Sequence, residues 1–262
     1  MKIIRHQSPT GPAYAALQPD GSARAITGDI YGDFKVTDQV VTPGKLLAPI
    51  QPAQILCIGL NYAKHAAESG AKVPERPVLF VKGINATQNP GDPIEIPTKL
   101  ASHEVDYECE LAVVIGAPAR NVSAVDAMAH VAGYTVCNDY AFRDYLENWY
   151  RPNLRVKNRD GATVLGPWFV DAADVPDPHD LTLRTLVNGQ VTQQGHTSNM
   201  VNDIPSLIEY LSSFMTLQSG DVILTGTPDG VINVNVGDEV ITEIDGIGRL
   251  VNTIVGDEPY GR

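Results

Sequence analysis

Length, composition and charge describe an ordinary globular chain. Its 262 residues are 43% hydrophobic and 19% charged, which excludes a disordered or fibrous chain and suffices for a full-sized core. The 31 acidic residues outnumber the 19 basic ones, and the formal net charge of −12 repels nucleic acid and anionic membranes. An anionic small molecule is therefore expected to bind only where local cations or a metal reverse the field.

Hydrophobic stretches and cysteines predict a cytoplasmic chain without a membrane partner. The longest apolar runs, such as LAVVIGAPA, are far shorter than the roughly 20 residues of a membrane helix, and MKIIRHQSPT lacks the apolar core of a secretion signal. Cys57, Cys109 and Cys137 lie far apart in apolar segments without a CxxC pair. We expect them to be buried, reduced thiols.

Strands are expected to dominate the chain from its start. Residues 1–50 alternate apolar and polar positions between turn signals, which predicts a small N-terminal β-ribbon region before a larger domain at residues 51–262. Further strands are expected at residues 55–60, 77–82, 105–115, 133–139 and 221–226. Because strands do not alternate regularly with helices, the sequence predicts an α+β, β-rich fold.

Helices and tight turns are marked by polar caps and glycines. The expected helices, each with a polar N-cap, run from Asn61 to Gly70, from Ser123 to Val131 and from Asp203 to Met215. One face of the third helix carries the apolar residues Leu207, Ile208, Leu211, Phe214 and Met215. The dipeptides Asn188-Gly189 and Asp245-Gly246 predict hairpin turns.

The apolar strand VDYECELAVVI carries two acids. Side chains alternate along a strand, so Glu108 and Glu110 lie on one face as neighbours. A solvated strand face would explain such a pair; a buried face would need a cation, because burial and repulsion both oppose ionisation. Asp139, at the end of another apolar strand, favours the second explanation. Three carboxylates suit a hard divalent cation such as Mg²⁺ or Mn²⁺.

Four segments together resemble the fumarylacetoacetate hydrolase family over roughly residues 55–255. They are GLNYAKHAAE, YECELAVVIG, GYTVCNDYAFRDY and LTGTPDG, in the family's order. The segments GYTVCNDYAFRDYLENWYRPNLRVKNRDG and DPHDLTLRTLVNGQVTQQG resemble the branch that degrades homoprotocatechuate (4-hydroxyphenylacetate). The resemblance implies a mixed β-sandwich roll, a homodimer and a 2-oxo acid substrate.

The resemblance also implies the ligands of a metal. Glu108, Glu110 and Asp139 would hold Mg²⁺ or Mn²⁺, with Ca²⁺ as a substitute in crystals. Lys157 would stabilise developing negative charge or shuttle a proton, although the sequence alone favours a solvated loop cation at this position.

Other residues are candidates for substrate contact or proton transfer. Gly226 and Thr227 could offer backbone N–H groups and a hydroxyl to a carboxylate, or form an ordinary turn after a strand. His65 and Glu68, at i and i+3, could form an acid–base pair or a plain surface hydrogen bond. Candidate partners of distal substrate carboxylates, or mere surface charges, are Lys82, Arg143, Arg151 and Arg155. His196 is expected to be structural.

Three functions agree with these residues. The first is a metal-dependent decarboxylase/isomerase that converts an unsaturated 2-oxo di- or tricarboxylate through a metal-bound dienolate in aromatic catabolism. The second is an acylpyruvate (fumarylpyruvate-type) hydrolase that cleaves a C–C bond of a 2,4-dioxo acid. The third is a metal-stabilised scaffold without turnover, which the intact set of candidate residues argues against. The chain has one copy of the domain, whereas members of this branch can carry two.

Overall fold

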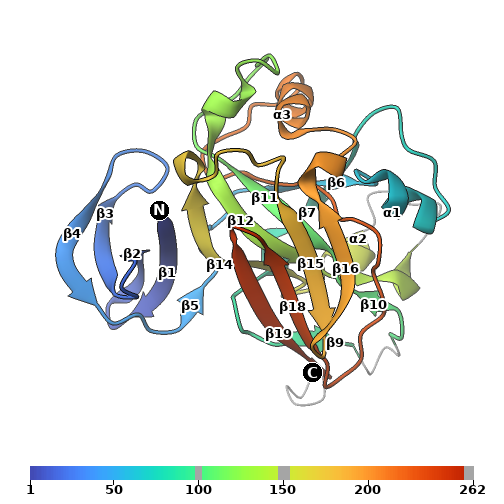
Figure 1. Ribbon diagram of the computed structural model, residues 1–262, viewed down its shortest axis with the longest axis horizontal. Helices are drawn as coiled ribbons and strands as arrows, with labels where there is room; N and C mark the ends of the chain where they lie inside the picture. Colours follow the sequence, from blue (N-terminus) through green and yellow to red (C-terminus); the bar gives the residue numbers. More distant parts are fainter. Residues whose placement is uncertain (98–101, 147–153, 257–262) are drawn as a thin grey trace.

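Two β-sheets stacked face to face form the body of the molecule (Figure 1). The computed structural model describes residues 1–97, 102–146 and 154–256. In this part of the chain, the larger sheet has 12 strands, and its main path runs β4 (Phe34–Val41), β3 (Ala23–Gly28), β2 (Gly11–Leu17), β1 (Lys2–Ser8), β14 (Thr163–Asp171), β12 (Val131–Asp139), β11 (Cys109–Ile115), β17 (Val222–Leu224), β6 (Ile55–Gly59) and β7 (Val78–Lys82). Off this path, β5 (Leu46–Leu47) pairs with β1 and β8 (Thr87–Gln88) pairs with β14.

The second sheet and the short elements complete the fold. The five-stranded sheet runs β16 (Gln190–His196), β15 (Thr182–Val187), β18 (Glu239–Ile244), β19 (Gly248–Gly256) and β9 (Ile94–Ile96), and β10 (Val105–Asp106) pairs with β13 (Ala141–Phe142). The α-helices of the described residues are α1 (Ala63–Glu68), α2 (Leu154–Lys157) and α3 (Ile204–Ser212). The 3₁₀ turns are η1 (Ile84–Ala86), η3 (Ala127–His130), η4 (Arg143–Tyr145), η5 (Ala172–Asp174) and η6 (Thr197–Asn199).

The large sheet is mixed. β17 pairs with β6 and β14 with β8 in parallel, whereas β12 pairs with both β11 and β14 in an antiparallel arrangement. The prediction of a β-rich, mixed fold with few helices is confirmed. None of the described helices is long and apolar enough to cross a membrane.

The N-terminal strands extend the large sheet. β1 to β4 form the expected β-ribbon, drawn in blue at one side of the molecule in Figure 1. β1 also pairs with β14, with Lys2 opposite Val170 and Ile3 opposite Phe169. The ribbon therefore continues the sheet that carries the acidic strand. A domain boundary at residue 50 stays a prediction.

Strand β11 lies at the centre and is covered on both faces. Leu111 and Val113 belong to the core shared with the five-stranded sheet, whereas Ala112 and Val114 belong to the core on the opposite face. All seven residues of β11 are buried, which explains the apolar run around Glu110. Glu110, which lies on the same face of β11 as Ala112, therefore points into the protein interior and not toward a solvated sheet face. The strand predicted at residues 105–115 is divided, because Tyr107 and Glu108 lie between β10 and β11.

Two local predictions are confirmed by their geometry. The side chain of Asp203 accepts a hydrogen bond from the N–H of Ser206 at 2.9 Å and caps α3. Asn188 and Gly189 have φ angles of 50° and 79° between β15 and β16, as a type I′ hairpin turn requires. Both signals act within a few residues.

Three helix predictions are wrong in detail. Asn61 does not cap α1, whose N-cap is Tyr62, because its side chain binds the carbonyl oxygens of Thr225 and Asn202 instead. The segment after Ser123 forms the four-residue turn η3 and not a helix. Helix α3 ends at Ser212, so Phe214 lies beyond the buried face and is 54% exposed.

Candidate functional site

Three buried carboxylates converge where β11 and β12 meet. The N–H of Asp139 donates to the carbonyl oxygen of Glu108 at 2.9 Å, and Glu110 lies opposite Cys137 in the ladder, so strand pairing brings the acids together. One carboxylate oxygen from each of Glu108, Glu110 and Asp139 lies within 4.8 Å of the others. Their exposed fractions are only 7%, 3% and 0%.

Acids and cations alternate around this cluster in what we call the ion-pair chain. Arg143 contacts Asp106 at 2.7 Å and Glu108 at 2.5 Å, and Lys157 contacts Glu108 at 2.6 Å and Asp139 at 3.0 Å. Lys82 forms the last pair of the series, with Asp139. The members in order are Asp106, Arg143, Glu108, Lys157, Asp139 and Lys82.

The cations keep Glu108 ionised and the acids keep Lys157 charged. Burial alone would raise the pKa of Glu108, but Lys157 and Arg143 outweigh it and lower this pKa to about 2. Burial would favour neutral Lys157, but Asp139 and Glu108 outweigh it and raise the lysine's pKa above its ordinary value. Both groups are therefore ionised at neutral pH.

Glu110 differs from the other two acids. It accepts a hydrogen bond from the N–H of Gly226 at 2.7 Å and has no cationic side chain as partner among the described residues. Burial, followed by the charges of Asp139 and Glu108, raises its pKa well above the ordinary range. A buried set of three carboxylates with one uncompensated member fits a hard divalent cation, which supplies the missing positive charge.

Two acids of the cluster, Glu108 and Glu110, line a cavity of about 320 Å³, which we call the acidic cavity, and Asp139 is fully buried beside them. Charged and polar lining comes from His65, Glu108, Glu110, Arg143, Lys157 and Thr227. Apolar lining comes from Ile58, Val78, Phe80, Leu146 and Val156. A small acid with a carbon chain can therefore place its charged head at the cluster and its chain against the apolar side.

The loop after β17 forms another part of this wall. Gly226 has φ +94°, and a Cβ there would lie 2.8 Å from Cβ of Asn61 and 3.0 Å from the carbonyl oxygen of Ile58, so only glycine fits. Thr227 is 3% exposed, and its hydroxyl donates to the carbonyl oxygen of Cys109 at 2.9 Å. Asn61 was missed as a site residue because its partners are distant in sequence.

His65 and Glu68 come close together on α1. Nδ1 of His65 lies 3.5 Å from Oε2 of Glu68, which is near enough for an ion pair, but Nδ1 makes no hydrogen bond. His65 is 6% exposed and lines the acidic cavity, whereas Glu68 is half-exposed and accepts the N–H of Gly230 at 3.2 Å. The geometry leaves the imidazole available to the cavity.

The other candidate cations lie elsewhere. Lys82 is 1% exposed, pairs with Asp139 and donates to the carbonyl oxygen of Ala162 at 3.3 Å, and does not line the acidic cavity. This placement favours support of Asp139 over the substrate contact that the sequence suggested. Arg155 lies 4.8 Å from the ring of Tyr145 in a separate pocket. Arg151 lies outside the described residues.

His196 and the three cysteines do not line the acidic cavity. His196 contacts the hydroxyl of Ser198 at 2.7 Å at the start of η6, a local structural role. Cys57, Cys109 and Cys137 are free and buried, and burial raises the pKa of all three thiols. The expectation of buried reduced thiols agrees with this arrangement.

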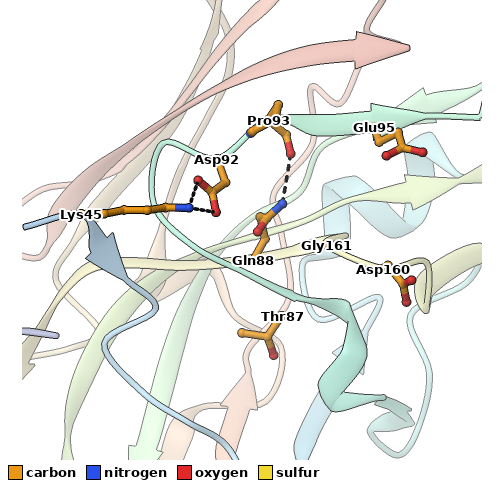
Figure 2. A pocket seen from close by; sticks show the side chains of 8 residues that line it. All are labelled: Lys45, Thr87, Gln88, Asp92, Pro93, Glu95, Asp160 and Gly161. Carbon is orange, nitrogen blue, oxygen red and sulfur yellow. Dashed lines mark hydrogen bonds and ion pairs between the residues drawn. The ribbon is translucent and has the colours of Figure 1, made fainter. Parts of the chain in front are cut away.

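A second pocket, which we call the loop pocket, has a volume of about 420 Å³ (Figure 2). Its lining residues are Lys45, Thr87, Gln88, Asp92, Pro93, Glu95, Asp160 and Gly161. Lys45, which is 56% exposed, pairs with Asp92 at 2.7 Å, and Figure 2 shows Glu95 and Asp160 apart from this pair. Among the described residues, the metal-ligand spacing is met at the acidic cavity and not here.

The structure defines a domain with a mixed β-fold and a buried acidic cluster beside a cavity. Comparison with known proteins gives its family. Residues 54–255 match the family model described as fumarylacetoacetate (FAA) hydrolase C-terminal, and residues 1–49 match one described as Rv2993c-like, N-terminal. The chain belongs to the fumarylacetoacetate hydrolase family, as the sequence resemblance implied.

Several relatives have named activities. The 4-hydroxyphenylacetate degradation bifunctional isomerase/decarboxylase of Salmonella dublin is 55% identical over 204 residues, 78% of this chain and 47% of that protein. Human mitochondrial oxaloacetate tautomerase FAHD2A is 41% identical over 218 residues, 80% of this chain and 69% of that protein. The structure of 5-carboxymethyl-2-hydroxymuconate delta-isomerase from Mycobacterium smegmatis has a TM-score of 0.87 at 39% identity, with coverage of 98% of this chain and 100% of that one.

The lengths of these relatives differ. The chain spans about half the length of the bifunctional relatives it matches. It covers the Mycobacterium smegmatis structure from end to end. The fold is therefore that of the whole single-copy relative, and membership in a family of enzymes supports an enzymatic function.

Proposed function

We propose that this chain is a divalent-metal-dependent decarboxylase/isomerase that acts on an unsaturated 2-oxo di- or tricarboxylate in aromatic catabolism. The observation that carries the proposal is the acidic cavity, where three buried carboxylates within 4.8 Å of one another adjoin Lys157 and His65. The names of relatives in 4-hydroxyphenylacetate degradation support the substrate class.

Glu108, Glu110 and Asp139 would hold the metal, for which we propose Mg²⁺ or Mn²⁺. When bound, such an ion supplies Lewis acidity toward the carboxylate and keto oxygens of a 2-oxo acid. Members of the ion-pair chain also hold two of these ligands in place. Lys82 holds Asp139, and Arg143 holds Glu108.

Lys157 is proposed to stabilise the negative charge of an enolate or dienolate. Its ammonium group lines the cavity and is held between Glu108 and Asp139 at 2.6 and 3.0 Å. Because the neighbouring acids raise its pKa, it stays charged at neutral pH and suits electrostatic stabilisation better than proton abstraction. Loss of CO₂ and movement of a double bond both pass through such an anion, so one charged donor serves both reactions.

His65 is proposed to move the proton. Its imidazole lines the cavity and its Nδ1 lies 3.5 Å from Glu68, a carboxylate that can orient the ring or accept a proton from it. Isomerisation requires a proton to leave one carbon and return to another. A histidine with a half-exposed acid behind it can exchange that proton with solvent.

The distance between His65 and Glu68 also supports a second candidate, an acylpyruvate hydrolase. The same pair could direct a water molecule at the distal carbonyl of a 2,4-dioxo acid. The relative named oxaloacetate tautomerase suggests a simpler proton transfer on a 2-oxo dicarboxylate. All three reactions use the same acidic cluster and differ in their products.

We also propose a homodimer located in the cytoplasm, with a small-molecule 2-oxo acid as substrate and no nucleic-acid or membrane partner. The net charge of −12 and the pockets lined by polar groups agree with this proposal. Light scattering of the purified protein measures the oligomeric state. A monomer at micromolar concentration would contradict the dimer.

Turnover by chelator-treated protein tests the function. The protein is assayed with and without Mg²⁺ or Mn²⁺ on 5-oxopent-3-ene-1,2,5-tricarboxylate, an acylpyruvate and oxaloacetate, while CO₂, pyruvate and enol content are followed. Metal-dependent CO₂ release from the tricarboxylate supports the decarboxylase/isomerase. Pyruvate from the acylpyruvate alone would assign the hydrolase, and turnover unaffected by chelation would contradict the metal.

A further inference from the structure

A buried glutamine lies directly behind the wall of the acidic cavity. Gln193 of β16 is 1% exposed and does not line the cavity. Its Nε2 donates to Oγ1 of Thr227 and to the carbonyl oxygen of Pro228, both at 2.8 Å. Its Oε1 accepts from the hydroxyl of Thr185 at 3.0 Å and from the N–H of Cys109 at 3.3 Å. The amide is thus fully hydrogen-bonded.

These partners fix the direction of every hydrogen bond. The carbonyl oxygen of Pro228 can only accept and the N–H of Cys109 can only donate, so the amide of Gln193 has one possible orientation. Oγ1 of Thr227 must therefore accept from Gln193. Its own proton points to the carbonyl oxygen of Cys109 at 2.9 Å, which can only accept. The hydroxyl proton of Thr227 is therefore used in a hydrogen bond inside the protein and cannot be donated to a ligand.

The remaining donor of Thr227 is its main-chain N–H. It makes no hydrogen bond to any described residue, whereas the N–H of Gly226 is used by Glu110. Thr227 is 3% exposed and lines the cavity. Because buried backbone donors nearly always have a partner, this N–H is expected to find one inside the cavity.

We propose that Gln193 is a positioning residue that locks Thr227 so that its main-chain N–H, and not its hydroxyl, binds a carboxylate oxygen of the substrate. That the ligand is a carboxylate rests on the proposed function. The hydroxyl then acts as an anchor that joins the loop after β17 to β11 and β16. Substrate affinity depends on Gln193 although this side chain never touches the substrate.

A direct test observes the N–H of Thr227 in the unmutated protein. Threonine is labelled with ¹⁵N, the Thr227 signal is assigned by its loss in Thr227→Ser, and oxalate is added as a small dicarboxylate probe in the presence of Mg²⁺. The proposal expects the Thr227 amide proton to move downfield as oxalate saturates. An unmoved Thr227 signal at saturating oxalate would overturn it.

A double-mutant cycle tests the role of Gln193. Gln193→Met and Thr227→Val are each expected to raise KM and the Kd of oxalate about tenfold, as loss of one well-placed hydrogen bond does, with kcat nearly unchanged. Since both break the same anchor, the double variant should be no weaker than the weaker single variant. Gln194→Met, at the exposed neighbouring position of β16, should behave as the unmutated chain, and circular dichroism verifies that each variant is folded.

The outcomes separate this inference from the proposed function. Full additivity of the two variants, or an unchanged Kd for oxalate in Gln193→Met, would show that the hydroxyl or another group binds the ligand and would overturn the inference alone. Absence of turnover on every substrate, with the Thr227 amide still shifted by oxalate, would leave the inference intact and defeat the proposed function.

Discussion

The acidic cavity and the loop pocket both contain carboxylates and a lysine, yet the two pockets differ in how deeply these charges are buried. The loop pocket is the larger of the two, at about 420 Å³ against about 320 Å³. Its lysine, Lys45, is 56% exposed and pairs with one acid, Asp92. In the acidic cavity, Lys157 is 6% exposed and contacts two acids at once.

The difference shows that volume does not identify a functional site. Exposed ion pairs such as Lys45 and Asp92 are solvated and contribute little to the free energy of unfolding, about 0–1 kcal/mol. Buried charges are unfavourable unless they are compensated, so a protein that gathers three buried acids needs a reason to do so. For the acidic cavity the reason that we propose is metal binding, and the following experiments test whether the two sites differ as expected.

The largest effect is expected from removal of a metal ligand. Glu110→Ala should lower metal-dependent turnover by about 10³-fold or more, because the ion loses one of three protein ligands. The fold should stay intact, since Glu110 makes one hydrogen bond to Gly226. Asp160→Ala in the loop pocket is the matched control and should keep full activity. Full activity in Glu110→Ala would reject the assignment of the site.

Loss of the buried lysine should have the next largest effect. Lys157→Met keeps the length of the side chain but removes the charge that faces the enolate, and kcat should fall about 10²–10³-fold. Lys45→Met removes the exposed lysine of the loop pocket and should change kcat less than twofold. Equal behaviour of the two variants in a steady-state assay would mean that burial does not distinguish these lysines.

A smaller loss is expected at the histidine. His65→Gln should reduce kcat about 10²-fold, the usual contribution of a positioned acid or base, and flatten the pH dependence of kcat/KM. His196→Gln is the control, because His196 contacts Ser198 and Asp180 near the surface and does not line the acidic cavity. If His65→Gln kept the normal pH profile, another group would be moving the proton.

The smallest effect concerns stability without metal. Folding raises the pKa of Glu110 above its ordinary value of 4.5, so the folded state binds more protons and stability falls as pH rises above that value. Glu110→Gln removes the unfavourable free energy of burying this carboxylate. At neutral pH, and without metal, the melting temperature of the variant should rise by about 2–4 °C for each ~1 kcal/mol of stability that it gains. The gain should vanish near pH 4. Thermal unfolding of both proteins is measured at pH 7 and near pH 4. If Glu110→Gln does not raise the melting temperature at pH 7, the charge of Glu110 is compensated in the absence of metal.

Short-range signals were predictable from sequence. Asp203 and the pair Asn188-Gly189 act on their own neighbours, so a cap and a turn followed directly from residue type. Asn61 carries the same capping signal, but Thr225 and Asn202 compete for its side chain across the fold. Local rules do not include such distant partners.

The site was predictable only in part for the same reason. Glu108, Glu110 and Asp139 were marked by acids in apolar strands, and the structure brings them together. Asp106 continues the same alternation two residues earlier and could have been noticed as a further acid. The role of Gln193 could not be predicted from its sequence neighbours, because its side chain forms hydrogen bonds with residues that are 34 and 84 positions away.

The loop after β17 keeps its place in the cavity wall only with a glycine at position 226. A side chain at position 226 would collide with Asn61 and the backbone of Ile58, displace the N–H that binds Glu110 and move Thr227. A substitution at this position is therefore expected to deform the cavity wall of this chain even when all three acids remain. The shape of the wall depends on a residue that has no side chain.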